Sequence, residues 1–272
     1  MPRLPRTPAT PSDAASGVTA YDPRIAVTGQ GRPLVYVPGM DGTGELFYRQ
    51  IPLLAPSYRV ATYALRDDAP DMARLIEDLA QVIARVAPDG EPAVLVGESF
   101  GGTLALSYAL AHPGSVAAIV VLNSFPRFLP QHRLWLARRA LRAMPWGAMR
   151  LVRRLTAFRL HSRHTHRAEV RRFLELTRRT TRAGYLGRLG ILATYDVRHR
   201  LGELRVPALF LAADEDHLIP SVREARAMAA AVPGATVRIL SGHGHSCLLA
   251  ADVDLAELLR EWGGIPSRGV RA

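Results

Sequence analysis

The stretch Ala93-Val-Leu-Val-Gly-Glu-Ser-Phe-Gly-Gly102 decides the fold of this chain. Its first four residues are apolar and β-rich, which is typical of a buried strand, and residues 103–111 have the pattern of a helix. Between them lies G-x-S-x-G, a tight strand-to-helix turn in which small glycines let neighbouring backbone pass close by. The segment predicts that Ser99 is exposed at the end of a strand, with the N-terminus of a helix aimed at it.

Short apolar runs alternate with amphipathic runs on both sides of this segment. The apolar runs predict strands at residues 34–37, 58–64, 93–96, 116–122, 208–211 and 236–240. The amphipathic runs predict helices at residues 71–87, 103–111, 221–232 and 252–262. This alternation is typical of parallel strands joined by crossover helices. The sequence therefore predicts an α/β fold with a doubly wound, mostly parallel sheet.

Positive charge is concentrated in one segment of the chain. The 272 residues include 35 basic side chains, all of them Arg, and 24 acidic ones, for a net charge of +11. Between Arg127 and Arg200 there are 19 Arg and three acidic residues, so this segment carries +16 and the remainder −5. Residues 132–160 and 168–182 have helical spacing without a strand pattern. The segment predicts an Arg-rich helical lid, residues 126–200, inserted between two strands.

The expected organisation has four parts. Residues 21–125 and 201–264 form the core, residues 126–200 the lid, residues 1–20 a disordered leader, and residues 265–272 a flexible tail. The leader contains four prolines and lacks the apolar stretch of a secretory signal, so we expect a cytoplasmic location. No apolar run reaches the length of about 18 residues that a membrane-spanning helix needs. Cys247 is the single cysteine, which excludes an intrachain disulfide framework.

Two further segments, each following a strand, carry the acid and base that a serine nucleophile requires. The strand at 208–211 precedes three carboxylates, Asp214, Glu215 and Asp216. The strand at 236–240 precedes two histidines, His243 and His245. In α/β proteins with this kind of serine turn, the three catalytic residues follow one another along the chain in the order serine, acid, histidine. This chain has the same order. The residues alone leave the choice among these acids and histidines open.

With these motifs, the chain resembles serine hydrolases of the α/β-hydrolase superfamily over roughly residues 33–262. The family acid commonly lies in G-x-x-D-x-x-x-P, which Ala213-Asp-Glu-Asp-His-Leu-Ile-Pro220 matches with Ala in place of Gly. The family histidine commonly ends G-x-G-H, which Gly242-His-Gly-His245 matches. The resemblance implies a catalytic triad of Ser99, Asp216 and His245, with His243 as the alternative base.

The resemblance also implies an oxyanion hole. Its two donors would be the backbone N–H of Phe100, directly after the serine, and that of Met40, after the strand at 34–37. Many relatives have His-Gly where this chain has Pro38-Gly39. Proline has no N–H, but the family donor is the residue after the glycine, so the resemblance still implies an oxyanion hole. The stretch Pro38-Gly-Met-Asp-Gly-Thr-Gly44 is similar to one in bacterial and plastid esterase and acyltransferase relatives. No G-K-[ST] follows it, which disfavours a nucleotide phosphate loop.

The predicted activity is hydrolysis of a carboxylic ester or thioester through an acyl-enzyme. An acyltransferase would use the same residues, and a non-catalytic binding protein would retain the fold. We expect no cofactor. We also expect no metal, because the histidine pairs at 164/166 and 243/245 lack carboxylate or cysteine partners at ligand spacing.

Three interpretations of the Arg-rich segment remain open. In the first, it is a lid whose Arg face is solvated. In the second, it attracts either an anionic acyl substrate, such as acyl-CoA or a carrier-bound acyl group, or an anionic membrane surface. In the third, it binds nucleic acid. Nucleic acid is disfavoured, because the segment lacks a recognisable binding module and offers few aromatic stacking platforms. Its Leu, Met, Trp and Phe residues predict a small-molecule substrate with a hydrophobic acyl group.

Overall fold

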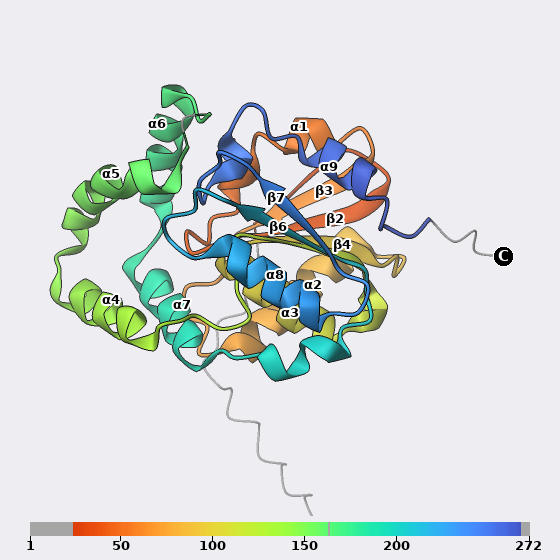
Figure 1. Ribbon diagram of the computed structural model, residues 1–272, viewed down its shortest axis with the longest axis horizontal. Coiled ribbons are helices and arrows are strands. Elements are labelled where there is room, and N and C mark those ends of the chain that lie inside the picture. The colour runs from red at the N-terminus through yellow and green to blue at the C-terminus, as the bar shows by residue number, and fades with distance from the viewer. Residues whose placement is uncertain (1–23, 163, 268–272) are drawn as a thin grey trace, which may run out of the picture.

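The computed structural model describes residues 24–162 and 164–267; the predicted leader and residues 268–272 of the expected tail lie outside these ranges. Seven strands form one sheet in the order β1-β3-β2-β4-β5-β6-β7 (Figure 1). The strands are β1 (Ile25–Thr28), β2 (Arg32–Val37), β3 (Tyr58–Tyr63), β4 (Ala93–Glu98), β5 (Val116–Leu122), β6 (Ala208–Ala213) and β7 (Thr236–Leu240). Only β1 runs antiparallel to its neighbour, β3. The predicted mostly parallel sheet is confirmed.

Helices cover both faces of the sheet (Figure 1). One face carries α2 (Met72–Val86), α3 (Phe100–Ala111) and α8 (Ser221–Ala231), and the other carries α1 (Ile51–Leu54) and α9 (Leu255–Trp262). Alternate residues of each central strand enter the two apolar cores; in β2, Val35 faces the first group of helices and Leu34 the second. Because both faces are buried, these strands read as continuous apolar runs in the sequence.

In the described ranges, four α-helices lie between β5 and β6. They are α4 (Gln131–Ala143), α5 (Met149–Leu160), α6 (Arg167–Leu176) and α7 (Arg182–Thr194). Figure 1 shows α4, α5 and α6 on one side of the sheet, with α7 between α4 and the sheet. Where this segment joins the sheet, Arg127 and Asp196 form an isolated antiparallel bridge and an ion pair of 3.4 Å. The chain therefore leaves the sheet after β5 and returns to it before β6 at one place. We refer to residues 126–200 as the helical insertion, and to the rest of the described chain as the sheet body.

Several element boundaries differ from the sequence-based expectation. The helix after Ser99 begins at Phe100 and not at residue 103, because the turn contains no additional loop. The helix expected at 168–182 ends at Leu176, and α7 starts separately after Thr181, whose hydroxyl accepts the N–H of Gly184 at 3.0 Å. Strand β1 was not expected; its four residues have little apolar alternation and are ordered by pairing with β3.

Short 3-10 helices connect the longer elements. They are η1 (Glu45–Phe47), η2 (Pro113–Ser115), η3 (Trp146–Ala148), η4 (Thr177–Arg179), η5 (Arg198–Glu203) and η6 (Cys247–Leu249). Within the described ranges, no helix has both the length and the apolar character needed to cross a bilayer.

The parallel strands place the chemically important loops together. The carboxyl ends of β2, β4, β6 and β7 lie at the same edge of the sheet, and each is followed by one of the segments singled out in the sequence. Ligands of open α/β sheets bind at this edge.

Candidate active site

Ser99 occupies a strained turn between β4 and α3. Its backbone has φ 55° and ψ −118°, a region that residues with a side chain rarely adopt. The flanking glycines are required by close backbone contacts: a Cβ on Gly97 would lie 2.4 Å from the carbonyl oxygen of Gly101, and one on Gly101 would lie 1.9 Å from that of Val37. The tight strand-to-helix turn expected from G-x-S-x-G is therefore present.

His245 and Asp216 meet across two neighbouring loops. The Nδ1 atom of His245 lies 2.7 Å from Oδ2 of Asp216. That carboxylate also accepts hydrogen bonds from the Ser221 hydroxyl and, at 2.8 Å, from the Leu218 N–H, so it is held firmly in one orientation. The adjacent Glu215 is exposed. With Nδ1 engaged, Nε2 is the ring nitrogen left for a substrate or nucleophile.

The neighbouring candidates, Asp214 and His243, have other contacts. Asp214 accepts the Ser241 hydroxyl at 2.8 Å and the Gly242 N–H at 2.7 Å, and so fixes the loop that carries both histidines. The Nε2 atom of His243 lies 3.7 Å from Asp252, and His243 is not among the residues that line the cavity containing His245. The geometry thus pairs Asp216 with His245 and gives Asp214 a supporting role.

The electrostatics of the pair favour an ionised acid beside a basic imidazole. Burial opposes ionisation of Asp216, but the charge of His245 and hydrogen bonds from His245, Ser221 and Leu218 outweigh it and lower the pKa of Asp216. Burial likewise opposes protonation of His245, but the charge and hydrogen bond of Asp216, with a contribution from Glu98, raise the pKa of His245 above 6.5.

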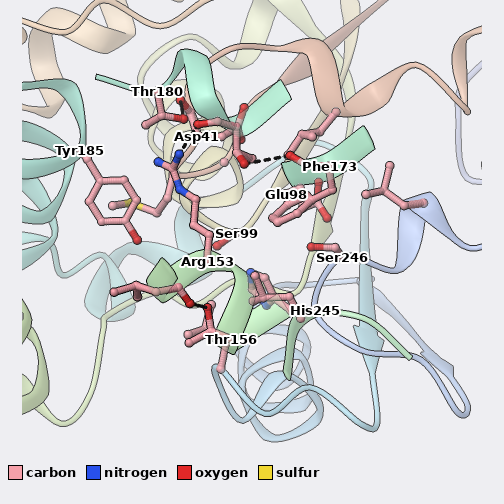
Figure 2. Close-up of a pocket in the computed structure, with 18 of the residues that line it drawn as sticks. Asp41, Glu98, Ser99, Arg153, Thr156, Phe173, Thr180, Tyr185, His245 and Ser246 are labelled. Carbon is pink, nitrogen blue, oxygen red and sulfur yellow. Dashed lines mark hydrogen bonds between the residues drawn. The ribbon is translucent and has the colours of Figure 1, made fainter. Parts of the chain in front are cut away.

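Ser99 and His245 line a cavity of about 360 Å³ whose walls come from both the sheet body and the helical insertion. Figure 2 shows these two side chains next to each other, with Arg153, Phe173 and Tyr185 of the helical insertion around the same space. Apolar side chains make up much of the wall: Met40, Leu46, Met149, Val152, Leu160, Phe173, Leu218 and Leu249. Among the described residues, no group of three or more His, Cys, Asp or Glu side chains is placed to hold a metal ion.

The loop after β2 passes close to Ser99. A Cβ on Gly39 would lie 3.6 Å from that of Ser99, and Met40 lines the cavity. Phe100 is the first residue of α3, where backbone N–H groups are unpaired and the helix dipole is positive. Within the described ranges, the N–H groups of Met40 and Phe100 make no hydrogen bond. Both predicted oxyanion donors therefore lie beside Ser99 with their N–H groups unused.

The helical insertion holds this loop in place. Arg188 of α7 donates from Nε to the carbonyl of Met40 at 3.1 Å and from a terminal nitrogen to that of Asp41 at 3.4 Å. The Thr180 hydroxyl donates to the same Asp41 carbonyl at 3.1 Å. The Arg188 side chain is almost fully buried and is neutralised by Asp67 at 3.5 Å. Sequence reasoning did not separate Arg188 from the other arginines of the segment.

Asn123, at the end of β5, positions the histidine loop and was also missed. Its Nδ2 donates to the carbonyl of His245 at 2.7 Å, and its Oδ1 accepts the N–H of Ala213 at 2.8 Å. Its backbone has φ 45°, a conformation that asparagine tolerates better than most residues. The sequence feature that could have indicated this role is an asparagine directly after a buried strand.

Glu98, the variable residue before Ser99, is a buried carboxyl group in the cavity wall. The Tyr36 hydroxyl donates to its Oε2 at 2.9 Å. Burial, with the charges of Asp41 and Asp216, raises the pKa of Glu98 to about 7, although His245 and the Tyr36 hydrogen bond act in the opposite direction. The sequence showed an acidic residue here but gave no indication of its burial.

Comparison with known proteins agrees with this architecture. The RutD protein of Escherichia coli (strain UTI89), named as a carbamate hydrolase, is 26% identical over 249 residues, 88% of this chain and 89% of RutD. The esterase EaEST from Exiguobacterium antarcticum superimposes with a TM-score of 0.79 at 18% identity, covering 88% of this chain and 94% of the esterase. The enol-lactonase from Burkholderia xenovorans LB400 superimposes with a TM-score of 0.75 at 18% identity, covering 89% of this chain and 94% of the enol-lactonase.

The family profile described as alpha/beta hydrolase fold matches residues 32–251, which is most of the chain. The protein belongs to the α/β-hydrolase fold family.

Proposed function

We propose that this protein is a serine hydrolase that cleaves a carboxylic ester or thioester through an acyl-enzyme. One observation carries the proposal: His245 is bound to Asp216 on one side and shares a cavity with Ser99, which the strained turn presents at the edge of the sheet. The names of similar proteins, an esterase, an enol-lactonase and a carbamate hydrolase, support chemistry at an acyl carbonyl.

In the first half of the reaction, the Ser99 oxygen attacks the carbonyl carbon while Nε2 of His245 accepts the hydroxyl proton. Asp216 keeps the Nδ1 proton in place and stabilises the imidazolium. The backbone N–H groups of Met40 and Phe100 donate to the carbonyl oxygen as it becomes negative. The tetrahedral intermediate then collapses: the carbon–oxygen or carbon–sulfur bond breaks, and the alcohol or thiol leaves with the proton from His245.

In the second half, a water molecule attacks the acyl-enzyme and His245 accepts one of its protons. The same oxyanion donors stabilise the second tetrahedral intermediate. Its collapse releases the carboxylic acid and returns the proton to the Ser99 oxygen. An alcohol or thiol in place of water would complete acyl transfer with the same residues, and product analysis with added acceptor distinguishes the two.

The cavity wall supports a hydrophobic acyl group as part of the substrate. Leu46 and Leu249 of the sheet body form an apolar cluster with Phe173 of the helical insertion, against which Leu160 packs. An acyl chain placed there is removed from water, which contributes roughly 0.8 kcal/mol for each buried methylene group. In this proposal the helical insertion acts as the lid of the acyl site.

Replacement of the nucleophile tests the proposal. In Ser99→Ala we expect kcat on p-nitrophenyl esters of short and medium chain length to fall roughly 10⁶-fold, because the covalent step is lost. Labelling by a fluorophosphonate probe should also disappear. Ser57→Ala, at an exposed serine of the sheet body, is the matched control and should behave as wild type. The proposal is wrong if the wild-type protein neither reacts with the probe nor hydrolyses any ester or thioester of such a panel.

A further inference from the structure

A second cleft lies on the helical insertion, between α5 and α6. Its volume is about 430 Å³. Five arginines line it, together with one carboxylate: Arg150, Arg153, Arg154, Arg171, Arg178 and Glu175. The formal charge of these side chains is therefore strongly positive, and the mechanism proposed above does not use the cleft.

Helix geometry places the arginines in two facing rows. Arg150 and Arg154 are four residues apart on α5, so they project from the same side of that helix. Arg171 on α6 and Arg178 in η4 are two turns apart and project from the facing element. Both rows border one cleft, so the opposing guanidinium groups can contact a single ligand.

These arginines are not neutralised by the protein. Arg150, Arg154, Arg171 and Arg178 are exposed, and none forms an ion pair or hydrogen bond with another residue of the described ranges. Like charges four residues apart on a helix repel each other and destabilise it. Glu175 offsets only one of the five charges. An anion bound in the cleft would relieve this repulsion.

Arg153 lies between the cleft and the catalytic cavity. It lines both spaces, and its guanidinium donates to the carbonyl of Thr177, which fixes its position. Figure 2 shows the Arg153 side chain in the cavity that contains Ser99 and His245. A ligand passing this side chain would have one end near the nucleophile and the other between the two rows of arginine.

We propose that the arginine cleft binds the phosphate groups of the substrate while the acyl chain occupies the catalytic cavity. The inference rests on the proposed esterase or thioesterase function and narrows its substrate class. The planar guanidinium group donates two parallel hydrogen bonds to phosphate oxygens, which makes arginine well suited to this ligand. The substrate is an acyl compound whose leaving group carries two or more phosphates, as an acyl-coenzyme A thioester does.

Two substrates with the same acyl group test the assignment. We expect wild-type kcat/KM to be at least about tenfold higher for octanoyl-coenzyme A than for octanoyl-pantetheine, which lacks the phosphates; a tenfold preference corresponds to about 1.4 kcal/mol. In Arg154→Gln/Arg171→Gln the preference should be lost, with octanoyl-pantetheine hydrolysis unchanged.

The matched control is Arg133→Gln/Arg142→Gln on α4. It removes the same number of charges from the helical insertion outside the cleft and should retain the preference for the coenzyme A substrate. Equal loss in the cleft variant and the control would overturn the proposal, because it would show only a general effect of net charge. Equal wild-type rates on the two substrates would also overturn it.

Direct binding separates this inference from the proposed function. Calorimetry on Ser99→Ala should detect coenzyme A and inorganic diphosphate, and adding Arg154→Gln/Arg171→Gln should weaken both at least about tenfold. Coenzyme A binding without hydrolysis of any ester or thioester would refute the proposed function and retain the phosphate site. Absence of coenzyme A binding, or binding only of phosphatidylglycerol vesicles, would refute the phosphate site even if ester hydrolysis is observed.

Discussion

The sheet body and the helical insertion differ in the burial and pairing of their charged side chains. In the sheet body, the charged groups of the candidate site are buried and paired, as in the contacts of Asp216 with His245 and of Glu98 with Tyr36. In the helical insertion, four of the five cleft arginines, all except Arg153, are exposed and unpaired within the described ranges. The helical insertion also has several large apolar side chains that are exposed: Trp135, Leu136, Leu151, Val152 and Leu155.

The difference follows from solvation. A buried charge without a partner costs several kcal/mol, so the sheet body can hold ionisable groups only in defined pairs, which fixes their positions. Charges in water are screened within roughly 10 Å at ordinary ionic strength, so the helical insertion can carry a large excess of arginine. In the proposed function, the sheet body carries the bond-breaking residues and the helical insertion selects the ligand.

The largest effect is expected from breaking a pair inside the sheet body. Asp216→Asn should lower kcat about 10⁴-fold, because an amide favours the wrong imidazole tautomer and does not stabilise the imidazolium. The rise of kcat/KM with pH should also shift to lower pH, since the Asp216 carboxylate raises the pKa of His245. Asp214→Asn, two residues earlier in the same loop, is the comparison, and we expect a smaller fall in kcat because Asp214 supports the histidine loop without contacting His245. If it reduces kcat as severely, the assignment of the acid is wrong.

A smaller effect is expected at Glu98. Its pKa is raised from 4.5 to about 7, so between these values the unfolded chain releases a proton that the folded protein keeps, and stability falls as pH rises. Glu98→Gln retains an acceptor for Tyr36 and does not ionise. The unfolding free energy of Glu98→Gln minus that of the wild type should therefore increase by up to about 3 kcal/mol from pH 4 to pH 8.

Urea denaturation at the two pH values measures this difference. Glu215→Gln removes an exposed carboxylate close to the site and should leave the wild-type pH dependence intact. If Glu98→Gln also follows the wild-type curve, Glu98 ionises in the folded protein as it does in the unfolded chain, and its burial has no energetic consequence.

The smallest effect is expected at the contact between the two regions. Arg188→Lys keeps the charge opposite Asp67 but loses at least one of the hydrogen bonds to the carbonyls of Met40 and Asp41. We expect kcat to fall about tenfold with little change in KM, because a small displacement of Met40 weakens an oxyanion donor.

Arg182→Lys is the matched control for this change. Arg182 also donates to backbone carbonyls of the helical insertion, those of Leu141 and Arg142, but does not contact the loop after β2. Steady-state kinetics on one p-nitrophenyl ester compares the two variants. Equal kcat values for both would show that Arg188 does not position the oxyanion loop.

Much of the fold was predictable because it depends on short-range patterns. Each of the six expected strands is present, since parallel strands buried on both faces leave uninterrupted apolar runs. The turn at Ser99 was predictable because two close backbone contacts admit only glycine at Gly97 and Gly101. Strand β1 was missed, since its order comes from pairing with β3 and not from its own composition.

The supporting residues of the candidate site were not predictable, because their contacts join distant parts of the chain. Asn123 reaches the histidine loop 122 positions later, and Arg188 reaches Met40 across 148 positions. Nothing in the local sequence of Arg188 distinguishes it from the exposed arginines of the same segment. The choice of Asp216 over Asp214 came from a family pattern, and their different hydrogen bonds now give it a geometric reason.

The sequence by itself determined the order along the chain of six of the seven strands and of the helices that cover the sheet, the strained turn that presents Ser99, and the concentration of arginine in one segment. These properties depend on residue type, spacing and local backbone sterics. Only the tertiary structure decided which arginine contacts the loop after β2 and which arginines face water, and which acid meets which histidine. Burial and pairing at long range set these environments, since a guanidinium group that is desolvated beside Asp67 holds backbone in place, whereas one that faces water is free to bind a ligand.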